Sequence, residues 1–223
     1  SQVFHDYPTA LAYVEKLGVP MVSKPNGAAA TENKALSYVA HDAADLTYTM
    51  QKWAKNPKYV AAARKDGFIL QEKISGIEYA VGGWFNGKTF SRYFLQNHEY
   101  KKHLNGGLGP NTGEMGTLTM YVTECELAKR CLIPLIPQLK KIGYVGFIDA
   151  SFMIKEDGTP AFMEFTMRFG YPLIHNQVAS HLGDPVMFMR DMLDGKDTLE
   201  VEVDKACIRD RKSTRLNSSH PGY

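Results

Sequence analysis

The sequence lacks any apolar run long enough for a membrane-spanning helix. Such a helix needs roughly 18 to 20 consecutive apolar residues, and no stretch of the chain approaches that length. The first residues, SQVFHDYPTA, also lack the basic and apolar regions of a signal peptide. We therefore expect a cytoplasmic protein without a membrane partner. With 223 residues and 44% hydrophobic content, the chain can bury a full core.

Cysteine is scarce as well. Cys125, Cys131 and Cys207 are odd in number, and none belongs to a CxxC pair. This pattern indicates neither a disulfide framework nor a zinc site. We expect buried, reduced thiols.

A strong excess of either charge is also missing, because the formal net charge is only +2. Residues 210–223 carry three basic side chains and one acidic side chain, so the rest of the chain has equal numbers of both. This tail resembles a translated sequencing-library adapter, which predicts a non-native segment. A disordered native tail is the alternative. Without the tail, the charge balance no longer argues for a nucleic-acid partner.

The beginning of the chain predicts a small α+β lobe. Asp6 can cap a helix that Gly18 ends, and Val19–Lys24 predicts a short buried strand. A second helix is expected from Asp42, followed by a helical turn around Tyr59–Arg64.

The next part predicts a sheet with helices beside it. Tyr79–Phe85 and Lys88–Leu95 are expected to form a hairpin around a two-residue type I′ turn at Asn86-Gly87. Helices are then expected from a capping box at Thr123 and Glu126 to about Lys141, interrupted at Pro134 and Pro137, and from Asp184-Pro185 to about Gly195.

Between the hairpin and these helices lies the sequence GPNTGEMG, residues 109–116. Glycine permits positive φ and close backbone approach, whereas proline fixes φ and removes a donor. The run predicts a rigid loop whose exposed N–H groups can hold phosphate or carboxylate oxygens. An ordinary turn is the alternative.

A second polar group is expected on a hairpin of Tyr144–Lys155 and Ala161–Arg168, joined by a two-residue turn at Asp157-Gly158. Alternation along the second strand puts Glu164, Thr166 and Arg168 on one face.

The same turn places Ser151 opposite Glu164 and Asp149 opposite Thr166. Such an oxygen-rich patch suits Mg²⁺, and Arg168 suits a phosphoryl group. A solvated face with a surface Glu164–Arg168 ion pair is the alternative.

Four blocks of sequence occur in a familiar order: Lys24-Pro-Asn-Gly, Gln71-Glu-Lys-Ile-Ser-Gly-Ile-Glu78, GPNTGEMG and Glu164-Phe-Thr-Met-Arg-Phe-Gly170. Together they resemble phosphoribosylamine–glycine ligase, an ATP-grasp enzyme, over about residues 8 to 205. The resemblance implies an α+β protein with the ATP-grasp fold, in which two lobes hold ATP between them.

The resemblance also implies roles for individual residues that bind the nucleotide. Lys24 and Lys34 contact the phosphates of ATP, and Glu78 binds the ribose. The backbone of Glu72, Lys73 and Ile74 meets the adenine.

Further roles follow for the metal and the substrates. The resemblance makes Glu164 a ligand of Mg²⁺ or Mn²⁺, and it gives Arg168 and Lys24 the role of neutralising the transferred phosphoryl group. Where the chain departs from the family, we expect Thr166 and, from across the hairpin, Asp149 to complete the metal site. Lys101 and Lys102, which follow Glu99, suit a substrate phosphate. Asn111, Thr112 and Gly113 face the substrate.

Some positions depart from the family. Thr166, Tyr171 and Leu173 stand where the family has an amide and two acids, and Glu114 stands in place of a glycine. The segment after Gly27 lacks the glycines of the family's phosphate loop.

The resemblance implies an enzyme of de novo purine biosynthesis. ATP would phosphorylate the carboxylate of glycine, and the amine of 5-phosphoribosylamine would attack the acyl phosphate to give an amide. Alternatives are an ATP-grasp ligase with another acid or amine, and a nucleotide-binding protein without ligase activity. We expect a small lobe over 1–75, a large lobe over 76–195 and the start of a truncated C-terminal domain over 196–209.

Overall fold

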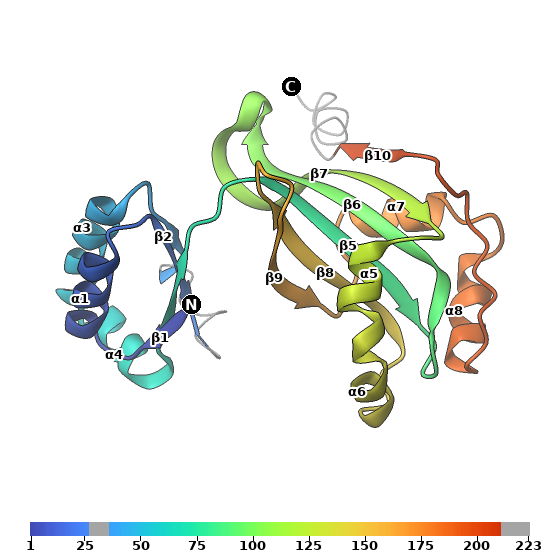
Figure 1. Cartoon of the computed structure of the whole chain (residues 1–223), viewed down its shortest axis with the longest axis horizontal. Coiled ribbons are helices and arrows are strands. Elements are labelled where there is room, and N and C mark those ends of the chain that lie inside the picture. The colour runs from blue at the N-terminus through green and yellow to red at the C-terminus, as the bar shows by residue number, and fades with distance from the viewer. Residues whose placement is uncertain (27–35, 211–223) are drawn as a thin grey trace, which may run out of the picture. The chain divides into compact units, whose positions relative to one another are not determined.

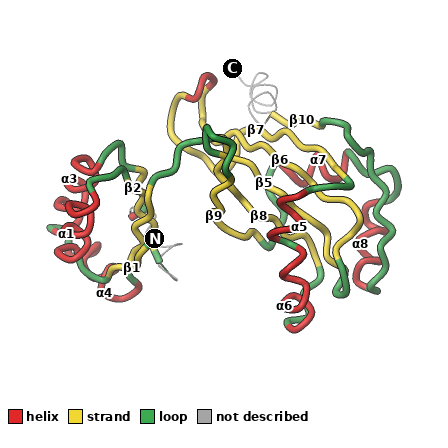
Figure 2. The backbone as a smooth tube through the Cα atoms, viewed as in Figure 1, coloured by secondary structure: helices red, strands yellow, loops and turns green. Residues whose placement is uncertain are grey.

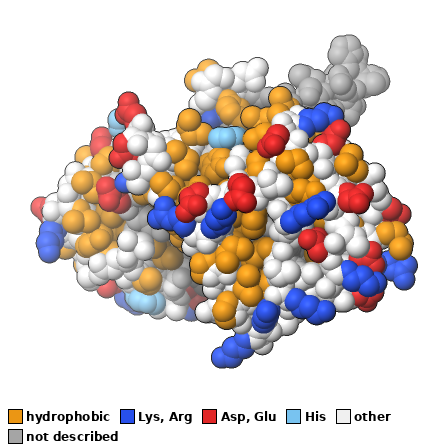
Figure 3. Space-filling view, turned by 45° about the vertical axis from the view of Figure 1, so that its right-hand side comes forward, with side chains coloured by type: hydrophobic (Ala, Val, Ile, Leu, Met, Phe, Trp, Pro, Cys, Tyr) orange, Lys and Arg blue, Asp and Glu red, His pale blue; other side chains and the backbone are white. Residues whose placement is uncertain are grey.

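The computed structural model describes residues 1–26 and 36–210 and divides the chain into two compact units, Ser1–Ile74 and Ser75–Tyr223. Both units combine helices with antiparallel sheets, so the α+β prediction is confirmed. Within the described ranges, no helix is long and apolar enough to span a bilayer. On the face seen in Figure 3, acidic and basic side chains are interspersed.

In its described part, residues 1–26 and 36–74, the first unit packs three helices on one side of a four-stranded sheet (Figure 1). The sheet has the order β1-β4-β2-β3. Its elements are β1 (Gln2–Phe4), α1 (Tyr7–Leu17), β2 (Met21–Pro25), β3 (Tyr38–Val39), α3 (Ala43–Ala54), α4 (Pro57–Asp66) and β4 (Phe68–Glu72).

The predicted start and end of α1 and the predicted start of α3 are confirmed, whereas the expected turn around Tyr59–Arg64 is a longer helix, α4. The Asp6 carboxylate accepts a hydrogen bond from the Thr9 N–H at 2.8 Å, and Gly18 ends α1 in the left-handed region at φ 62°. Asp42 caps α3 in the same way. Alternation along β2 buries Met21 and Ser23 against the helices and puts Lys24 on the other face.

The second unit is built on a six-stranded antiparallel sheet with the order β10-β7-β6-β5-β8-β9. The long strands β6 and β7 are joined by a short 3₁₀ turn, Asn105–Gly107 (Figure 2). The strands are β5 (Ile77–Phe85), β6 (Phe90–Leu104), β7 (Leu108–Val122), β8 (Gly146–Ile154), β9 (Pro160–Thr166) and β10 (Cys207–Asp210). The helices are α5 (Glu126–Cys131), α6 (Ile136–Lys141), α7 (Leu173–Ala179) and α8 (Pro185–Leu193).

Each face of this sheet has its own core. Residues of α5 and α6 pack with Val81, Phe85 and Ile148 on one face. On the other face, α7 and α8 pack with Trp84 and Phe147. Gly82 lies under Phe147, because a Cβ at position 82 would come 2.1 Å from Cζ of that ring.

Several local predictions are wrong. The connection after Phe85 has four residues, not two, because Phe85 pairs with Phe90 and the Asn86 side chain accepts from the N–H groups of Lys88 and Thr89. Strand β6 continues to Leu104 instead of ending at Leu95.

Other corrections concern the helices and the edge strand. Cys125, rather than Thr123, is the N-cap of α5, and its side chain makes no cap hydrogen bond. The expected interruption at Pro134 is confirmed, since the 3₁₀ turn Ile133–Leu135 separates α5 from α6, but Pro137 lies in the first turn of α6 and does not interrupt it. Asp210, which we expected in the tail, pairs with Gly116 at the end of β10. Cys125 is buried and the other two cysteines are half-buried, and all three are free.

The GPNTGEMG sequence is part of a strand, which corrects the loop prediction. Tyr100 pairs with Gly116 and Lys102 with Asn111, so four residues of β7, 112–115, lie opposite the single residue Lys101. This is a large, irregular bulge in the strand pair, with more extra residues than the common types that place two residues opposite one.

Candidate functional site

The second unit carries a row of aligned residues across its sheet. Strand pairing places Glu164 opposite Ser151, Ser151 opposite Ala80, Ala80 opposite Asn97 and Asn97 opposite Thr119. Side chains of paired residues lie on the same face, and so do side chains two residues apart on one strand. The face that α7 and α8 cover at one end is therefore polar at the other.

Six residues on this part of the sheet form what we call the carboxylate cluster: Glu78, Glu99, Lys101, Glu114, Asp149 and Glu164. Four of them, Glu78, Glu99, Lys101 and Glu164, line a small pocket of ≈ 40 Å³. The pocket is also lined by Tyr79, Ser151, Phe152 and Met163.

Lys101 is the ammonium group inside this cluster. It forms an ion pair and hydrogen bond with Glu99, and its Nζ lies 3.9 Å from Oε2 of Glu78. Burial alone would lower the pKa of Lys101, but Glu99 and Glu78 reverse this effect and raise it. Lys101 is therefore charged and engaged by carboxylates, and its contact with a substrate phosphate stays a prediction.

A hydrogen-bond chain fixes the position of Glu99. The Thr117 hydroxyl donates to Oδ1 of Asn97, and the Asn97 amide donates to Oε1 of Glu99 at 3.2 Å. Asn97 and Thr117 are both buried. The sequence does not identify these three as site residues: Asn97 and Glu99 lie beyond the predicted end of their strand at Leu95, and Thr117 lies in β7, which the sequence predicts as a loop followed by an unassigned segment.

Two carboxylates of the cluster are almost fully buried, each with a residue exposure of 5%. Burial, and then repulsion from Glu99, raises the pKa of Glu114 to about 8. The same two causes raise the pKa of Asp149 to about 7. Among the described residues, Oε1 of Glu114 and Oδ1 of Asp149 have no hydrogen-bond partner. Buried oxygens of this kind are costly unless a ligand satisfies them.

The predicted metal ligands meet as expected from the strand register. Asp149 pairs with Thr166, and Ser151 pairs with Glu164. Glu164 is exposed and Thr166 half-buried. Arg168 lies just beyond β9, is exposed, and donates from its guanidinium to the carbonyl of Phe169 at 3.0 Å.

These residues fit a divalent cation that a nucleotide completes. No group of three His, Cys, Asp or Glu residues in the described ranges could hold a metal by itself. Mg²⁺, however, usually takes one or two carboxylates and completes its shell with substrate phosphates and water. Asp149, with its unpartnered oxygen, and Glu164 provide that donor set.

In the GPNTGEMG segment, the structure shows how the bulge is held. The Thr112 hydroxyl donates to the carbonyl of Lys101 at 2.7 Å. Gly113 is exposed, whereas Glu114 and Met115 are buried. Of the other predicted substrate residues, Lys102 and Asn111 are paired across the two strands.

The first unit holds the remaining predicted nucleotide-binding residues. Lys24 is half-buried on β2, and Glu72 ends β4. The Lys73 N–H donates to the carbonyl of Pro20 at 2.9 Å, and its ammonium donates to the carbonyl of Ala40 at 3.0 Å.

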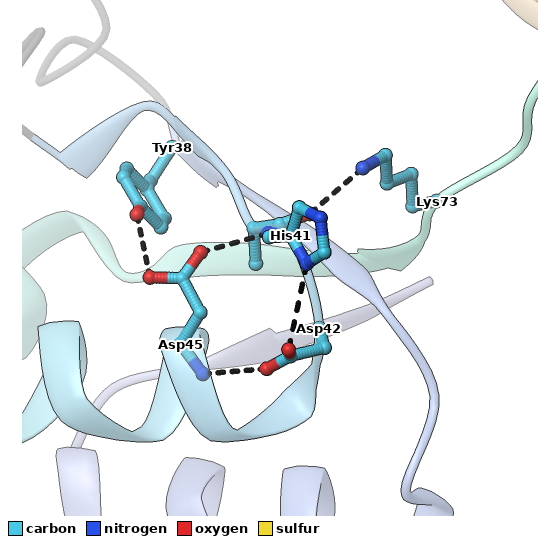
Figure 4. Close-up of polar contacts among 6 residues, drawn as sticks. Tyr38, His41, Asp42, Asp45 and Lys73 are labelled. Carbon is cyan, nitrogen blue, oxygen red and sulfur yellow. Dashed lines mark hydrogen bonds and ion pairs between the residues drawn. The ribbon is translucent and has the colours of Figure 1, made fainter.

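The Ala40 region is in turn ordered by carboxylates (Figure 4). Asp45 accepts from the Tyr38 hydroxyl and from the His41 N–H, both at 2.7 Å, and Asp42 accepts from the Asp45 N–H. Lys73 thus ties the end of β4 to an ordered helix start. Ile74 follows as the last residue of the unit and is 36% exposed. Lys34 lies outside the described residues.

Tyr171 and Leu173, which stand where the family has acids, lie in different environments. Leu173 begins α7 and is 1% exposed, packed in the core with Trp84 and Phe188. An acid at that position would be a buried charge, so leucine stabilises the helix against the sheet. Tyr171 is 56% exposed, and its ring contacts that of His175.

Comparison with known proteins identifies the fold and the family. Residues 1–173 match the family model described as phosphoribosylglycinamide synthetase, ATP-grasp (A) domain. Phosphoribosylamine–glycine ligase from Ralstonia nicotianae is 30% identical over 215 residues, which are 92% of this chain and 49% of that protein. The enzyme of the same name from Streptococcus pneumoniae is 28% identical, over 91% of this chain and 48% of that protein.

Solved structures show the same fold. The crystal structure of phosphoribosylamine–glycine ligase from Thermotoga maritima matches 94% of this chain and 53% of that protein, with a TM-score of 0.69 and 21% identity. An ADP complex of N5-carboxyaminoimidazole ribonucleotide synthetase has a TM-score of 0.61 at 13% identity, over 97% of this chain and 55% of that protein. The chain spans about half the length of the curated relatives it matches. This chain belongs to the phosphoribosylglycinamide synthetase ATP-grasp domain family.

Proposed function

We propose that this chain carries the ATP-grasp centre of a ligase that joins glycine to 5-phosphoribosylamine. In that reaction ATP phosphorylates the glycine carboxylate, and the amine displaces phosphate from the acyl phosphate to form an amide. The observation that carries the proposal is the carboxylate cluster, which brings Asp149 and Glu164 together by strand pairing in a chain of this family.

The chain's own residues would bind and orient the reactants. Lys24 would contact the ATP phosphates, Glu78 the ribose, and Arg168 the transferred phosphoryl group. The backbone of Glu72 to Ile74 would meet the adenine, and Lys73 would hold that backbone in place through Pro20 and Ala40.

Asp149 and Glu164, with Thr166, would hold Mg²⁺ or Mn²⁺. When bound, the cation would neutralise the charge of the ATP phosphates and of the phosphoryl group in transfer. Arg168 would add a pair of donors to the same oxygens. Phosphoryl transfer depends mainly on such positioning and charge neutralisation.

The substrates would lie against the bulge of β7. Lys102, Asn111, Thr112 and Gly113 would contact the acceptor, and Lys101 would order the carboxylates around it. We also propose that Ser1–Ile74 acts as the small lobe and that the second unit is the large lobe.

Two measurements on the full chain test the proposal. ATP affinity is measured with and without Mg²⁺, for the chain and for Glu164→Ala, with Glu124→Ala as a matched exposed control. We expect Mg²⁺ to strengthen ATP binding and Glu164→Ala to remove that dependence. ATP binding that ignores both changes would contradict the metal site.

The second measurement is phosphate release from ATP with glycine and 5-phosphoribosylamine, compared with a panel of other acids and amines. Release that depends on both named substrates supports the reaction. Release with another pair would indicate a ligase of different specificity, and ATP binding without release would indicate a nucleotide-binding protein.

A further inference from the structure

The turn that joins β6 to β7 carries an Asn-Gly pair, Asn105-Gly106, at the outer end of the hairpin (Figure 2). Both residues are exposed, and so are Leu104 and Gly107 on either side. Gly106 has the left-handed values φ 68° and ψ 22°, and nothing lies within 4 Å of a Cβ added there. The main-chain nitrogen of Gly106 therefore has no side chain of its own beside it, and no atom from beyond the turn crowds that space.

Tyr100 holds the two ends of this turn. Its hydroxyl donates to the carbonyl of Leu104 at 2.5 Å and accepts from the N–H of Gly107 at 2.9 Å. These contacts lie on either side of the peptide bond between Asn105 and Gly106. They keep the tip of the turn at the surface, where water and hydroxide reach that peptide bond.

A second Asn-Gly pair, Asn86-Gly87, lies in the opposite environment. Asn86 is only 7% exposed. Its Oδ1 accepts from the N–H groups of Lys88 and Thr89 at 3.0 and 2.9 Å, and its Nδ2 donates to the carbonyl of Gly195 at 3.2 Å. Turning the Asn86 amide carbon toward the next main-chain nitrogen would break all three hydrogen bonds in a buried place.

The surface position of Asn105 gives its side chain no such protection. Asn105 also makes an interaction, but it does so at an exposed position, where water competes for the same groups. The sequence contains one further Asn-Gly pair, Asn26-Gly27, whose glycine lies outside the described residues. The comparison that the structure provides is therefore between Asn105 and Asn86.

We propose that Asn105 is a modification site, at which the adjacent glycine nitrogen and water convert the side-chain amide to a carboxylate. The Gly106 nitrogen loses its proton to hydroxide and attacks Cγ of Asn105. The new N–Cγ bond closes a five-membered succinimide ring, the Cγ–Nδ2 bond breaks, and the amide group takes a proton from water and leaves as ammonia. A water molecule then opens the ring at either carbonyl, which gives aspartate or isoaspartate.

The modification changes the end of the hairpin in two ways. Each product replaces a neutral amide with a negative charge, so the net charge of the chain falls by one. The isoaspartate product also adds one carbon atom to the main chain of the turn that Tyr100 closes. The reaction consumes only water, so this inference does not rest on the proposed function.

The test follows the full chain over time, folded in buffer and unfolded in urea, at neutral and at mildly alkaline pH. Samples are digested and their peptides are separated and weighed. In the folded chain we expect the peptide that contains Asn105 to gain about one mass unit and to separate into an aspartate and an isoaspartate form. The rate should rise with pH, because the attacking nitrogen must first lose a proton.

Asn86 provides the internal comparison. In the folded chain its reaction should be roughly 10-fold slower than that of Asn105, or slower still, because three hydrogen bonds must break first. In urea both residues precede a glycine without folded structure, so their rates should be similar.

Two variants identify the residue and the products. Asn105→Gln keeps the amide but would need a six-membered ring, so the mass gain of this peptide should disappear. Asn105→Asp marks where the aspartate product elutes, and the remaining product is then the isoaspartate.

Four outcomes would overturn the inference. The first is an unchanged Asn105 in the folded chain over a time in which the unfolded chain reacts. The second is equal protection of Asn105 and Asn86 by folding. The third is formation of aspartate alone, which would mean direct hydrolysis without the ring. The fourth is an undiminished mass gain in Asn105→Gln, which would place the reaction at another residue of the peptide.

Discussion

The Thr112 hydroxyl donates a hydrogen bond to the main-chain carbonyl of Lys101 at 2.7 Å, across the bulge between β6 and β7. This contact links β6 and β7 at the carboxylate cluster. On one strand is the lysine that neutralises Glu99, and on the other is the segment that buries Glu114. The GPNTGEMG sequence therefore shapes the site through a bulge in a strand pair, not through a free loop.

Replacing Thr112 with valine should loosen this bulge. Valine has the shape of threonine without the hydroxyl, so the Lys101 carbonyl loses a donor at a net cost of about 1 kcal/mol. We expect a lower free energy of unfolding in urea denaturation and greater solvent exposure of Glu114. Thr112→Ser retains the hydroxyl and should behave like the original chain. Equal losses in both variants would show that the methyl group matters, not the hydrogen bond.

The pairing of Asp149 with Thr166 was predicted correctly although the turn was not. The sequence suggested a two-residue turn at Asp157-Gly158, whereas Ile154 pairs with Pro160 and the loop is longer. A bulge between Ser151 and Phe152 then shifts the register by one residue and restores the expected partners. The longer loop and the bulge shift the strand register by one residue in opposite directions, so the two shifts cancel. A bulge depends on packing of both sheet faces, which a turn motif alone does not reveal.

The end of β6 shows a different limit of prediction from sequence. The polar run from His98 to Lys102 contains residues that rarely favour strands, so the hairpin was expected to stop at Leu95. In the structure, pairing with β7 holds the run as a strand, and alternation then places Asn97, Glu99 and Lys101 on one face. The alternation of Asn97, Glu99 and Lys101 is visible in the sequence. It places them on one face only if the run is a strand, and that depends on the pairing with β7.

Lys101 should be far more important for stability than its neighbour Lys102. Replacing Lys101 with methionine removes the ammonium that Glu99 and Glu78 share, and it also removes a positive charge that attracts Glu114 and Asp149. Breaking a buried ion pair costs about 3–5 kcal/mol. Since 32% of the Lys101 side chain is exposed, we expect a smaller loss, on the order of 2 kcal/mol. Urea denaturation at neutral pH measures it.

Lys102→Met is the matched control for this change. It removes the same charge from the next residue on β6 and should change the free energy of unfolding much less. Similar losses in the two variants would mean that the carboxylate cluster does not depend on Lys101.

Gly82 should tolerate no side chain. A Cβ at this position would lie 2.1 Å from Cζ of Phe147, a residue buried in the core beneath α7 and α8. Overpacking of this kind typically costs about 1–3 kcal/mol. We expect Gly82→Ala to lower the midpoint of thermal unfolding, and Phe147→Leu to recover part of the loss in the double variant. Gly113→Ala, where nothing lies within 4 Å of the added Cβ, should have little effect.

The buried carboxyl groups should make the protein less stable as pH rises toward 8. Glu114 changes from an ordinary pKa of 4.5 to about 8 on folding, through burial and then repulsion from Glu99. Between these values the folded state holds a proton that the unfolded state has lost, so unfolding releases a proton and the free energy of unfolding falls with pH. The slope for one group is at most about 1.4 kcal/mol per pH unit.

Asp149 also makes the free energy of unfolding fall as pH rises, up to its pKa of about 7. Lys101, which interacts with both carboxyls and whose pKa is raised, stays charged over this range. Above pH 7 the decline should therefore come mainly from Glu114, so Glu114→Gln should remove it there and, below pH 7, should leave only the smaller decline that Asp149 contributes. Urea denaturation from about pH 5 to about pH 8 measures both slopes. Identical slopes above pH 7 in the two proteins would show that Glu114 is ionised in the folded state well below pH 8, and that the cluster already provides it with a counter-charge.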